Sequence, residues 1–322
     1  MALSPMPHDP RLYRITAIWN WDSIVELFFI DGPTRALIDT GASYTPRQYV
    51  EPALRWLGLE LADIDVILNT HGHQDHMGGN HALLNQVDAQ VYMHREDAYL
   101  VEDLEAHMDF IWHADRHVLG QDLSARRAQF LHTVTGPSAV HRKLDDNEIV
   151  DLGDDIQLRV VHLPGHSPGS IAYHWEDKGI AFVGDAVQGY GSKPGTFPLY
   201  YTARGYEQSM QRLASLQIET LVLAHRYLWT QDARDALRSG KAAEQTVQDS
   251  IAVTQMIHQA VQEALRAHAG AGFLPVALAA TQALAAEMPF TIEPRTGLPT
   301  GLPATLYSHY TELTGGSKSP VT

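Results

Sequence analysis

The chain has 322 residues, which at about 150 residues per domain predicts roughly two domains. Apolar residues make up 44% and charged residues 19%, so the sequence can bury a sizeable core and does not belong to the disordered class. The 38 acidic side chains against 23 Lys and Arg give a formal net charge of −15. This charge argues against nucleic acid and against an anionic membrane surface as a partner.

Two further counts are informative, the 18 histidines and the absence of cysteine. Without cysteine the chain has no disulfide, thiolate metal site, Fe–S cluster or cysteine nucleophile. Imidazole is the commonest metal ligand, so the histidines indicate where to look for chemistry. The N-terminus lacks the pattern of a signal peptide, and the apolar runs are too short to span a membrane. We therefore expect a soluble, cytoplasmic protein.

The first hundred residues predict alternating strands and helices. Strands are expected at 13–19, 23–30, 35–38, 65–68 and 90–93, with helices at 46–57 and from residue 82 onward. This alternation favours a layered α/β domain. Residues 96–132 are polar and lack strand periodicity, which indicates a helical or irregular insertion. That insertion either forms a lid over the site or is a surface helix.

The second half first returns to strands and then changes character. Strands are expected at 148–152, 156–161, 171–175, 180–183 and 220–223, with a helix at 207–215. Beyond residue 230 the composition shifts to Ala, Gln and Glu, and helical spacing of apolar residues predicts helices at 247–265 and 276–287. We therefore expect a catalytic domain over 1–230 and a helical C-terminal extension over 231–322. The extension would cap the site or form a homodimer interface.

Residues 70–80, with the sequence THGHQDHMGGN, carry the strongest chemical signal. They place four metal-ligand side chains within six residues, directly after a predicted strand: His71, His73, Asp75 and His76. Several imidazoles and a carboxylate in one tight loop lack hydrogen-bond partners unless a cation joins them. Neutral imidazole nitrogen and carboxylate oxygen are suitable zinc ligands. A solvated histidine-rich loop is the alternative, and the buried strand before the loop disfavours it.

Three later polar residues also follow predicted strands. His166 lies in HLPGHSPGS (162–170), Asp185 follows the strand at 180–183, and His225 follows the strand at 220–223. Polar groups at strand ends converge on one edge of a sheet, where α/β proteins place their sites. Each alone has an ordinary structural explanation, which for Asp185 is a turn cap. The repeated arrangement favours one shared site.

Together, the H-x-H-x-D-H run, the P-G-H-S-P-G-S segment, the strand-end Gly-Asp and the final strand-end His resemble the metallo-β-lactamase fold superfamily over about residues 13–230. The resemblance implies an αββα sandwich, in which two mixed sheets lie between helices. It implies two sets of metal ligands that share a bridging Asp185: His71, His73 and His166 for one ion, and Asp75, His76 and His225 for the other. The implied cofactor is a pair of divalent ions, foremost Zn²⁺, with Mn²⁺ and Fe²⁺ as alternatives.

The complete ligand set limits the branches of the family to which the chain can be compared. Cysteine-ligated β-lactamases are disfavoured because the chain has no cysteine, and mononuclear iron persulfide dioxygenases do not need the second ligand set. Flavodiiron relatives usually place Glu at the position of His73 and carry a flavodoxin domain. Nuclease relatives are disfavoured by the charge of −15. The group that remains resembles hydroxyacylglutathione hydrolases, N-acyl homoserine lactonases and the quinolone-pathway thioesterase, the last also through its helical extension.

The function expected on this basis is hydrolysis of an ester, lactone or thioester carbonyl of a small molecule by a metal-bound hydroxide. Asp75 would also act catalytically, by orienting the hydroxide or receiving its proton. An iron-dependent oxidoreductase and a phosphodiesterase are the alternatives among enzymes. A protein that keeps the site only for regulation is disfavoured by the complete ligand set.

Further residues are expected around the ligands. Asp39 follows the strand at 35–38 and would accept the spare N–H of a ligand histidine, with an Asx turn as the alternative. His162 is expected to be a buried, hydrogen-bonded neighbour rather than a ligand. Tyr190, Tyr200 and Tyr201 are candidate substrate contacts, where a hydroxyl would donate to the oxyanion, or side chains that pack the loop.

Overall fold

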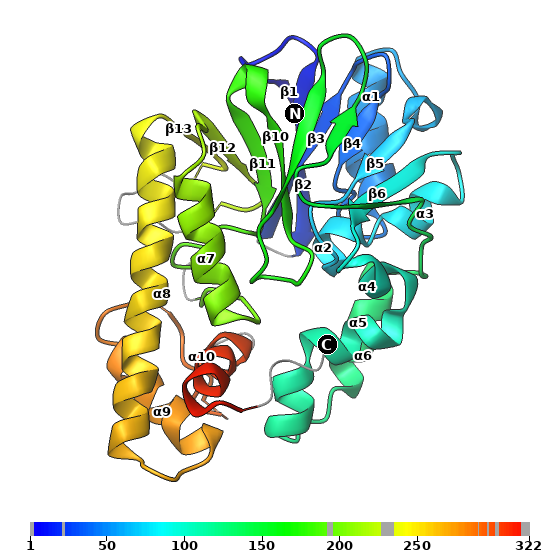
Figure 1. Cartoon of the computed structure of the whole chain (residues 1–322). Helices are drawn as coiled ribbons and strands as arrows, with labels where there is room; N and C mark the ends of the chain where they lie inside the picture. Colours follow the sequence, from blue (N-terminus) through cyan, green and yellow to red (C-terminus); the bar gives the residue numbers. More distant parts are fainter. Residues whose placement is uncertain are drawn as a thin grey trace.

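The computed structural model describes residues 3–20, 23–191, 196–226, 235–288, 290–294, 296–299 and 303–316. Two β-sheets pack face to face, and helices cover their outer sides (Figure 1). The expected αββα sandwich with C-terminal helices is confirmed. Within these ranges, no helix is both long and apolar enough to cross a membrane.

The first sheet has seven strands in chain order. They are β1 (Leu3–Pro5), β2 (Leu12–Asn20), β3 (Ser23–Ile30), β4 (Ala36–Ile38), β5 (Val66–Leu68), β6 (Gln90–His94) and β7 (Arg142–Leu144). β1 to β4 are antiparallel neighbours, and β4 to β7 pair in parallel. Parallel strands end at the same edge of a sheet, so the loops after β4, β5 and β6 lie together.

The second sheet has six strands in the order β13-β12-β11-β10-β9-β8. They are β8 (Ile149–Asp151), β9 (Gln157–His162), β10 (Ile171–Trp175), β11 (Ile180–Gly184), β12 (Thr220–Leu223) and β13 (Leu237–Ser239). Only the pair of β11 and β12 is parallel. The edge strand β13 comes from beyond residue 230, so the C-terminal part of the chain contributes to the sandwich itself. The proposed boundary at residue 230 lies outside the described residues.

Helices and helical turns fill the connections. They are η1 (Pro46–Val50), α1 (Glu51–Trp56), η2 (Leu61–Asp63), α2 (Gln74–Met77), α3 (Asn80–Leu84), α4 (Ala98–Glu102), α5 (Leu104–Ile111), η3 (Ala114–Val118), α6 (Ser124–Thr133), η4 (Glu176–Lys178), α7 (Ala203–Ala214), α8 (Lys241–Ala267), α9 (Phe273–Leu284) and α10 (Ala304–Thr314). The predicted insertion at 96–132 is therefore a run of helices, from α4 to α6.

The sheets are joined by a dry core of alternating inward side chains. Phe28 of β3 and Phe182 of β11 meet across it, with ring centroids 5.2 Å apart, and Trp175 is fully buried beside them. Burial of each such side chain contributes roughly 1.5–3 kcal/mol. The sandwich is therefore a rigid base for the loops at its edge.

The C-terminal helices attach to this base through α7 and through one loop. Val247 of α8 packs into the cluster beneath α7, while Ile257 and Val261 pack against α9 in a separate cluster. From α10, Thr305 donates to the Pro198 carbonyl at 2.6 Å and accepts from the Tyr200 amide at 3.0 Å. The last helix therefore holds the loop that follows β11.

A pH-dependent contact secures α10 on that loop. The hydroxyl of Tyr200 and Nε2 of His309 are 2.8 Å apart, and Tyr200 stacks on Tyr206. Burial, together with the neighbouring His258, lowers the pKa of His309 to about 3. His309 is therefore neutral at neutral pH, and a hydrogen bond joins its Nε2 to the Tyr200 hydroxyl.

We expect acid to destabilise the protein partly through His309. The unfolded chain takes up this proton near pH 6.5, so the stability is fully present above that pH and is lost progressively toward pH 3. At pH 5 the loss amounts to about 2 kcal/mol. In thermal unfolding followed by circular dichroism, the melting temperature of His309→Phe should fall less between pH 7.5 and pH 5 than that of the native protein. An equal loss in both proteins would contradict the assignment.

Candidate metal centre

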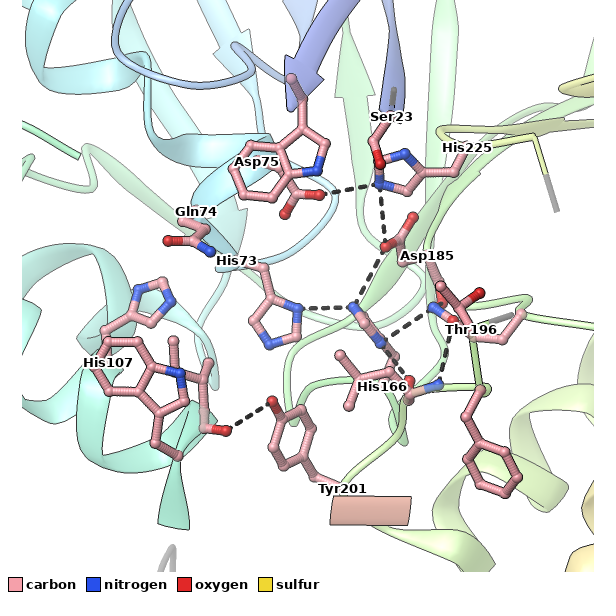
Figure 2. A pocket seen from close by; sticks show the side chains of 16 residues that line it. Ser23, His73, Gln74, Asp75, His107, His166, Asp185, Thr196, Tyr201 and His225 are labelled. Carbon is pink, nitrogen blue, oxygen red and sulfur yellow. Dashed lines mark hydrogen bonds and ion pairs between the residues drawn. The ribbon is translucent and has the colours of Figure 1, made fainter. Parts of the chain in front are cut away.

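The candidate ligands follow strands whose ends lie at one edge of the sandwich. β9, β11 and β12 run in the same direction, because β9 and β11 are each antiparallel to β10 and β11 is parallel to β12. The remaining candidates lie in the loop after β5 and in α2. The structure brings all of them together in two adjoining groups: His71, His73 and His166, and Asp75, His76, Asp185 and His225. Figure 2 shows five of these side chains around the cavity: His73, Asp75, His166, Asp185 and His225.

In the first group, ring nitrogens face one another at short range. Nδ1 of His73 lies 2.7 Å from Nε2 of His166, which lies 3.1 Å from Nε2 of His71. Nδ1 of His166 donates to the Leu199 carbonyl at 2.6 Å, so its Nε2 carries a lone pair. Nδ1 of His71 contacts the Thr70 hydroxyl, which itself donates to a carboxylate. Two lone pairs at 3.1 Å repel each other, and a cation held by both nitrogens would remove the repulsion.

In the second group, carboxylate oxygens face the histidines. Nε2 of His225 lies 3.1 Å from Asp75 and 3.5 Å from Asp185, and Nε2 of His76 lies 3.6 Å from Asp185. The same Oδ2 of Asp185 lies 3.6 Å from Nε2 of His166 in the first group. One carboxylate oxygen therefore faces both groups, which is the position that a bridging ligand needs.

Outer hydrogen bonds fix the orientation of the second group. Asp39 Oδ2 accepts from Nδ1 of His76 at 2.8 Å, which is the contact expected of it, and both its oxygens accept from Thr70. Nδ1 of His225 donates to the Ile24 carbonyl at 2.6 Å. Each of these bonds leaves Nε2 turned toward the group, as metal-ligating histidines require.

The protonation of the two groups differs because only one contains carboxylates. Burial and the neighbouring imidazoles lower the pKa of His71 and of His73 well below the usual value. Burial opposes the charge on His225 too, but Asp185 and Asp75 outweigh it and raise its pKa to about 9. The donor set therefore fits divalent cations, whose binding would displace protons from the second group. Two buried atoms without a hydrogen-bond partner support this fit: Nε2 of His76 and Oδ1 of Asp185.

A cavity of about 260 Å³ opens beside the ligands. Apolar and aromatic side chains form much of its lining: Trp19, Ile111, Trp112, Phe197, Leu199 and Tyr201. Among the lining residues that the structure describes there is no Lys or Arg. The helix α5 supplies part of this wall and the fully buried His107, whose pKa is lowered by burial to about 4. The insertion therefore forms a side of the cavity.

The three candidate tyrosines lie in different surroundings. Tyr201 lines the cavity with its ring centroid 5.8 Å from that of His73, and its hydroxyl donates to the Ile111 carbonyl. Tyr200 points away into the contact with α10. Tyr190 packs against the cluster of C-terminal helices. Tyr201 is thus the tyrosine of the three that is placed to contact a substrate.

His162 supports the site from a distance. Its Nε2 bonds the Pro168 carbonyl at 2.8 Å, and its ring stacks on His94 with centroids 3.9 Å apart. Pro168 belongs to the loop that carries His166. His162 therefore braces a ligand loop and contacts no ligand ring in these interactions.

Asp97 is a positioning residue that sequence reasoning missed. Its fully buried carboxylate accepts the amide of Gly72 at 2.7 Å, the amide of Gly169 at 2.6 Å and the hydroxyl of Ser167 at 2.6 Å. It thereby ties the loop of His71 and His73 to the loop of His166. Gly169 has no room for a side chain, since a Cβ would lie 2.6 Å from the Asp97 amide.

Replacing Asp97 with Asn should loosen both ligand loops. The amide offers one acceptor oxygen in place of two, so at least one buried N–H loses its partner at a cost of about 1–3 kcal/mol. We expect a lower melting temperature and a lower zinc content after dialysis against a weak chelator. The exposed Asp88→Asn is the matched control and should leave both unchanged. A variant at Asp97 with native zinc content would contradict this role.

Comparison with known proteins agrees with this geometry. The model of the metallo-beta-lactamase superfamily matches residues 25–225. Acyl-coenzyme A thioesterase MBLAC2 from Gallus gallus is 35% identical over 153 residues, which cover 48% of this chain and 52% of that protein. Hydroxyacylglutathione hydrolase from Gloeobacter violaceus is 31% identical over 196 residues, which cover 60% of this chain and 59% of that protein.

A solved structure extends the likeness over nearly the whole chain. A metallo-beta-lactamase family protein from Thermus thermophilus superposes with a TM-score of 0.70 at 22% identity, over 97% of both chains. This likeness shows the fold, C-terminal helices included. The chain itself spans about half the length of the curated relatives that it matches.

Proposed function

Because this chain belongs to the metallo-beta-lactamase superfamily, we propose that it is a binuclear metal-dependent hydrolase that cleaves the carbonyl bond of a small ester, lactone or thioester. A thioester is the leading substrate class, since the curated relatives are named for hydrolysis of acyl groups on coenzyme A or glutathione. Zn²⁺ is the proposed metal, with Mn²⁺ and Fe²⁺ as alternatives. The cytoplasmic location and the homodimer stay predictions from the sequence.

The single observation that carries the proposal is the convergence of two donor groups on one oxygen of Asp185. This oxygen lies 3.5–3.6 Å from ring nitrogens of His76, His166 and His225. When bound, two divalent ions in such a site polarise a carbonyl and lower the pKa of a shared water toward neutrality. These distances support the proposed assignment of the ligands: His71, His73 and His166 for one ion, and Asp75, His76 and His225 for the other.

Asp75 is the carboxylate best placed to handle a proton. Its side chain is 15% exposed and lines the cavity, whereas that of Asp39 is 3% exposed and fully engaged by hydrogen bonds. Without metal, burial opposes the charge of Asp75, but His76 and His225 outweigh it and keep the pKa of Asp75 below its usual value. An ionised carboxylate at this position can orient a water and accept its proton.

The apolar wall points to the part of the substrate that enters the cavity. Ile111, Trp112 and Phe197 offer dispersion and burial but no charge, so they suit an aliphatic or aromatic acyl group. Tyr201 contributes its ring, because its hydroxyl already donates to a backbone carbonyl. The acyl group would then lie on the aromatic side, with its carbonyl toward the donor groups.

A hydrolysis screen on zinc-loaded and manganese-loaded protein tests the proposal. Thioesters, esters and lactones with apolar acyl groups should be hydrolysed, and activity should disappear with chelator and return with metal. Phosphodiesters and β-lactams are the comparison substrates. A sharp preference for phosphodiesters, or stoichiometric iron with oxygen consumption and no hydrolysis, would overturn the carbonyl assignment.

Replacing Asp75 with Ala should reduce kcat by about 100-fold or more, because the group that orients the water and takes its proton is lost. Melting temperature and metal content are measured on the same samples, since Asp75 is also a proposed ligand. The exposed Asp88→Asn serves as the control with native turnover. Unchanged turnover in the Asp75 variant would refute its catalytic role.

A further inference from the structure

Two buried ring nitrogens on the same side of the cavity have no hydrogen-bond partner, Nε2 of His73 and Nε2 of His107. Their ring centroids lie 6.2 Å apart, and both residues line the cavity. Figure 2 shows His107, on the helical insertion, on the His73 side of the site. An unpaired buried polar atom costs free energy, so two of them side by side call for an explanation.

The protonation of His107 follows from its other nitrogen. Nδ1 lies 3.1 Å from the Leu100 carbonyl, which can only accept a hydrogen bond. Nδ1 of the neutral ring therefore carries the proton, and Nε2 carries a lone pair. His107 is fully buried, so this lone pair has no solvent to satisfy it.

In His73 the two ring nitrogens have the opposite roles from those in His107. Its Nδ1 faces Nε2 of His166 at 2.7 Å and is the atom turned toward the donor group. When Nδ1 gives its lone pair to a cation, the neutral ring carries its proton on Nε2. His73 thus presents a donor on the side where His107 presents an acceptor.

The other ligand histidines show what is missing at His73. Their outer nitrogens each contact an oxygen of the protein, namely Thr70 Oγ1 for His71, Asp39 Oδ2 for His76, Leu199 O for His166 and Ile24 O for His225. Metal-ligating histidines almost always have such an outer partner, which fixes the ring and raises its basicity. Within the part of the chain that the structure describes, His107 Nε2 is the unpaired acceptor beside the outer nitrogen of His73.

We propose that His107 is the positioning residue for ligand His73, and that its Nε2 accepts the hydrogen bond of His73 Nε2–H. The ring centroids lie 6.2 Å apart, so the contact forms by rotation of the rings or through one water that accepts from His73 Nε2–H and donates to His107 Nε2. The insertion from α4 to α6 would then hold a metal ligand as well as a wall of the cavity. This inference rests on the metal centre and is independent of the substrate proposed above.

Zinc affinity tests this role without any substrate. His107→Phe keeps an aromatic ring but removes the acceptor, and it should weaken zinc binding at the group that contains His73 by about 10–100-fold in competition with a chromophoric chelator. His107→Gln retains an acceptor oxygen and should restore most of that affinity. The matched control is His174→Phe, because His174 is also a buried histidine with an unpaired Nε2 but lies on β10 outside the cavity. It should bind zinc as the native protein does.

The outcomes separate a positioning role from general packing. Equal zinc affinity in folded His107→Phe and native protein overturns the proposal, as does an equal loss in the Phe and Gln variants. If the Phe variant fails to fold, ¹⁵N NMR of the native imidazoles decides. The proposal expects the Nδ1–H form of His107 and a shift of its Nε2 resonance when zinc is added, and an unmoved resonance overturns it.

Discussion

The structure is organised around the close packing of lone-pair-bearing nitrogen and oxygen atoms at one edge of the sandwich, where they repel one another. Ring nitrogens of His71 and His166 lie 3.1 Å apart, and a carboxylate oxygen of Asp185 lies 3.6 Å from the second of them. Such groups stay together only if the surrounding chain holds them there and a positive charge joins them. The dry core between the sheets supplies the rigidity, and the donor set selects the cation.

Hydrogen-bond acceptors around the candidate ligands keep the ligand side chains and their loops in place. Asp39, the Leu199 carbonyl and the Ile24 carbonyl each take one ring N–H, and Asp97 ties the two histidine loops through their backbone. These acceptors come from both sheets and from the helical insertion. The orientation of each ligand is thus a property of the whole fold, and a single hydrogen bond far from the chemistry carries part of it.

The candidate ligands could be recognised from the sequence because their signal is local. His71 and His73 lie in one short run after a strand, and Asp185 and His225 follow strands that were recognisable by their apolar residues. Asp97 had no such signal, since its partners Gly72 and Gly169 are 25 and 72 positions away. The three-residue edge strands β1, β7 and β13 were missed because their sequences, LSP, RKL and LRS, lack the apolar run that marks the equally short β4 (ALI) and β5 (VIL).

The candidate tyrosines also show that the sequence does not predict which way an individual side chain points. Tyr200 and Tyr201 are neighbours in an extended loop, where successive side chains point to opposite sides. Tyr201 lies in the cavity wall and Tyr200 in the contact with α10, and nothing in the local sequence distinguishes them.

The contact between α10 and this loop also has an evolutionary consequence, because α10 holds the loop whose Leu199 carbonyl orients His166. Replacing the C-terminal helices during evolution would also remove the contact that positions this loop. We therefore expect the helical extension and the sandwich to evolve together.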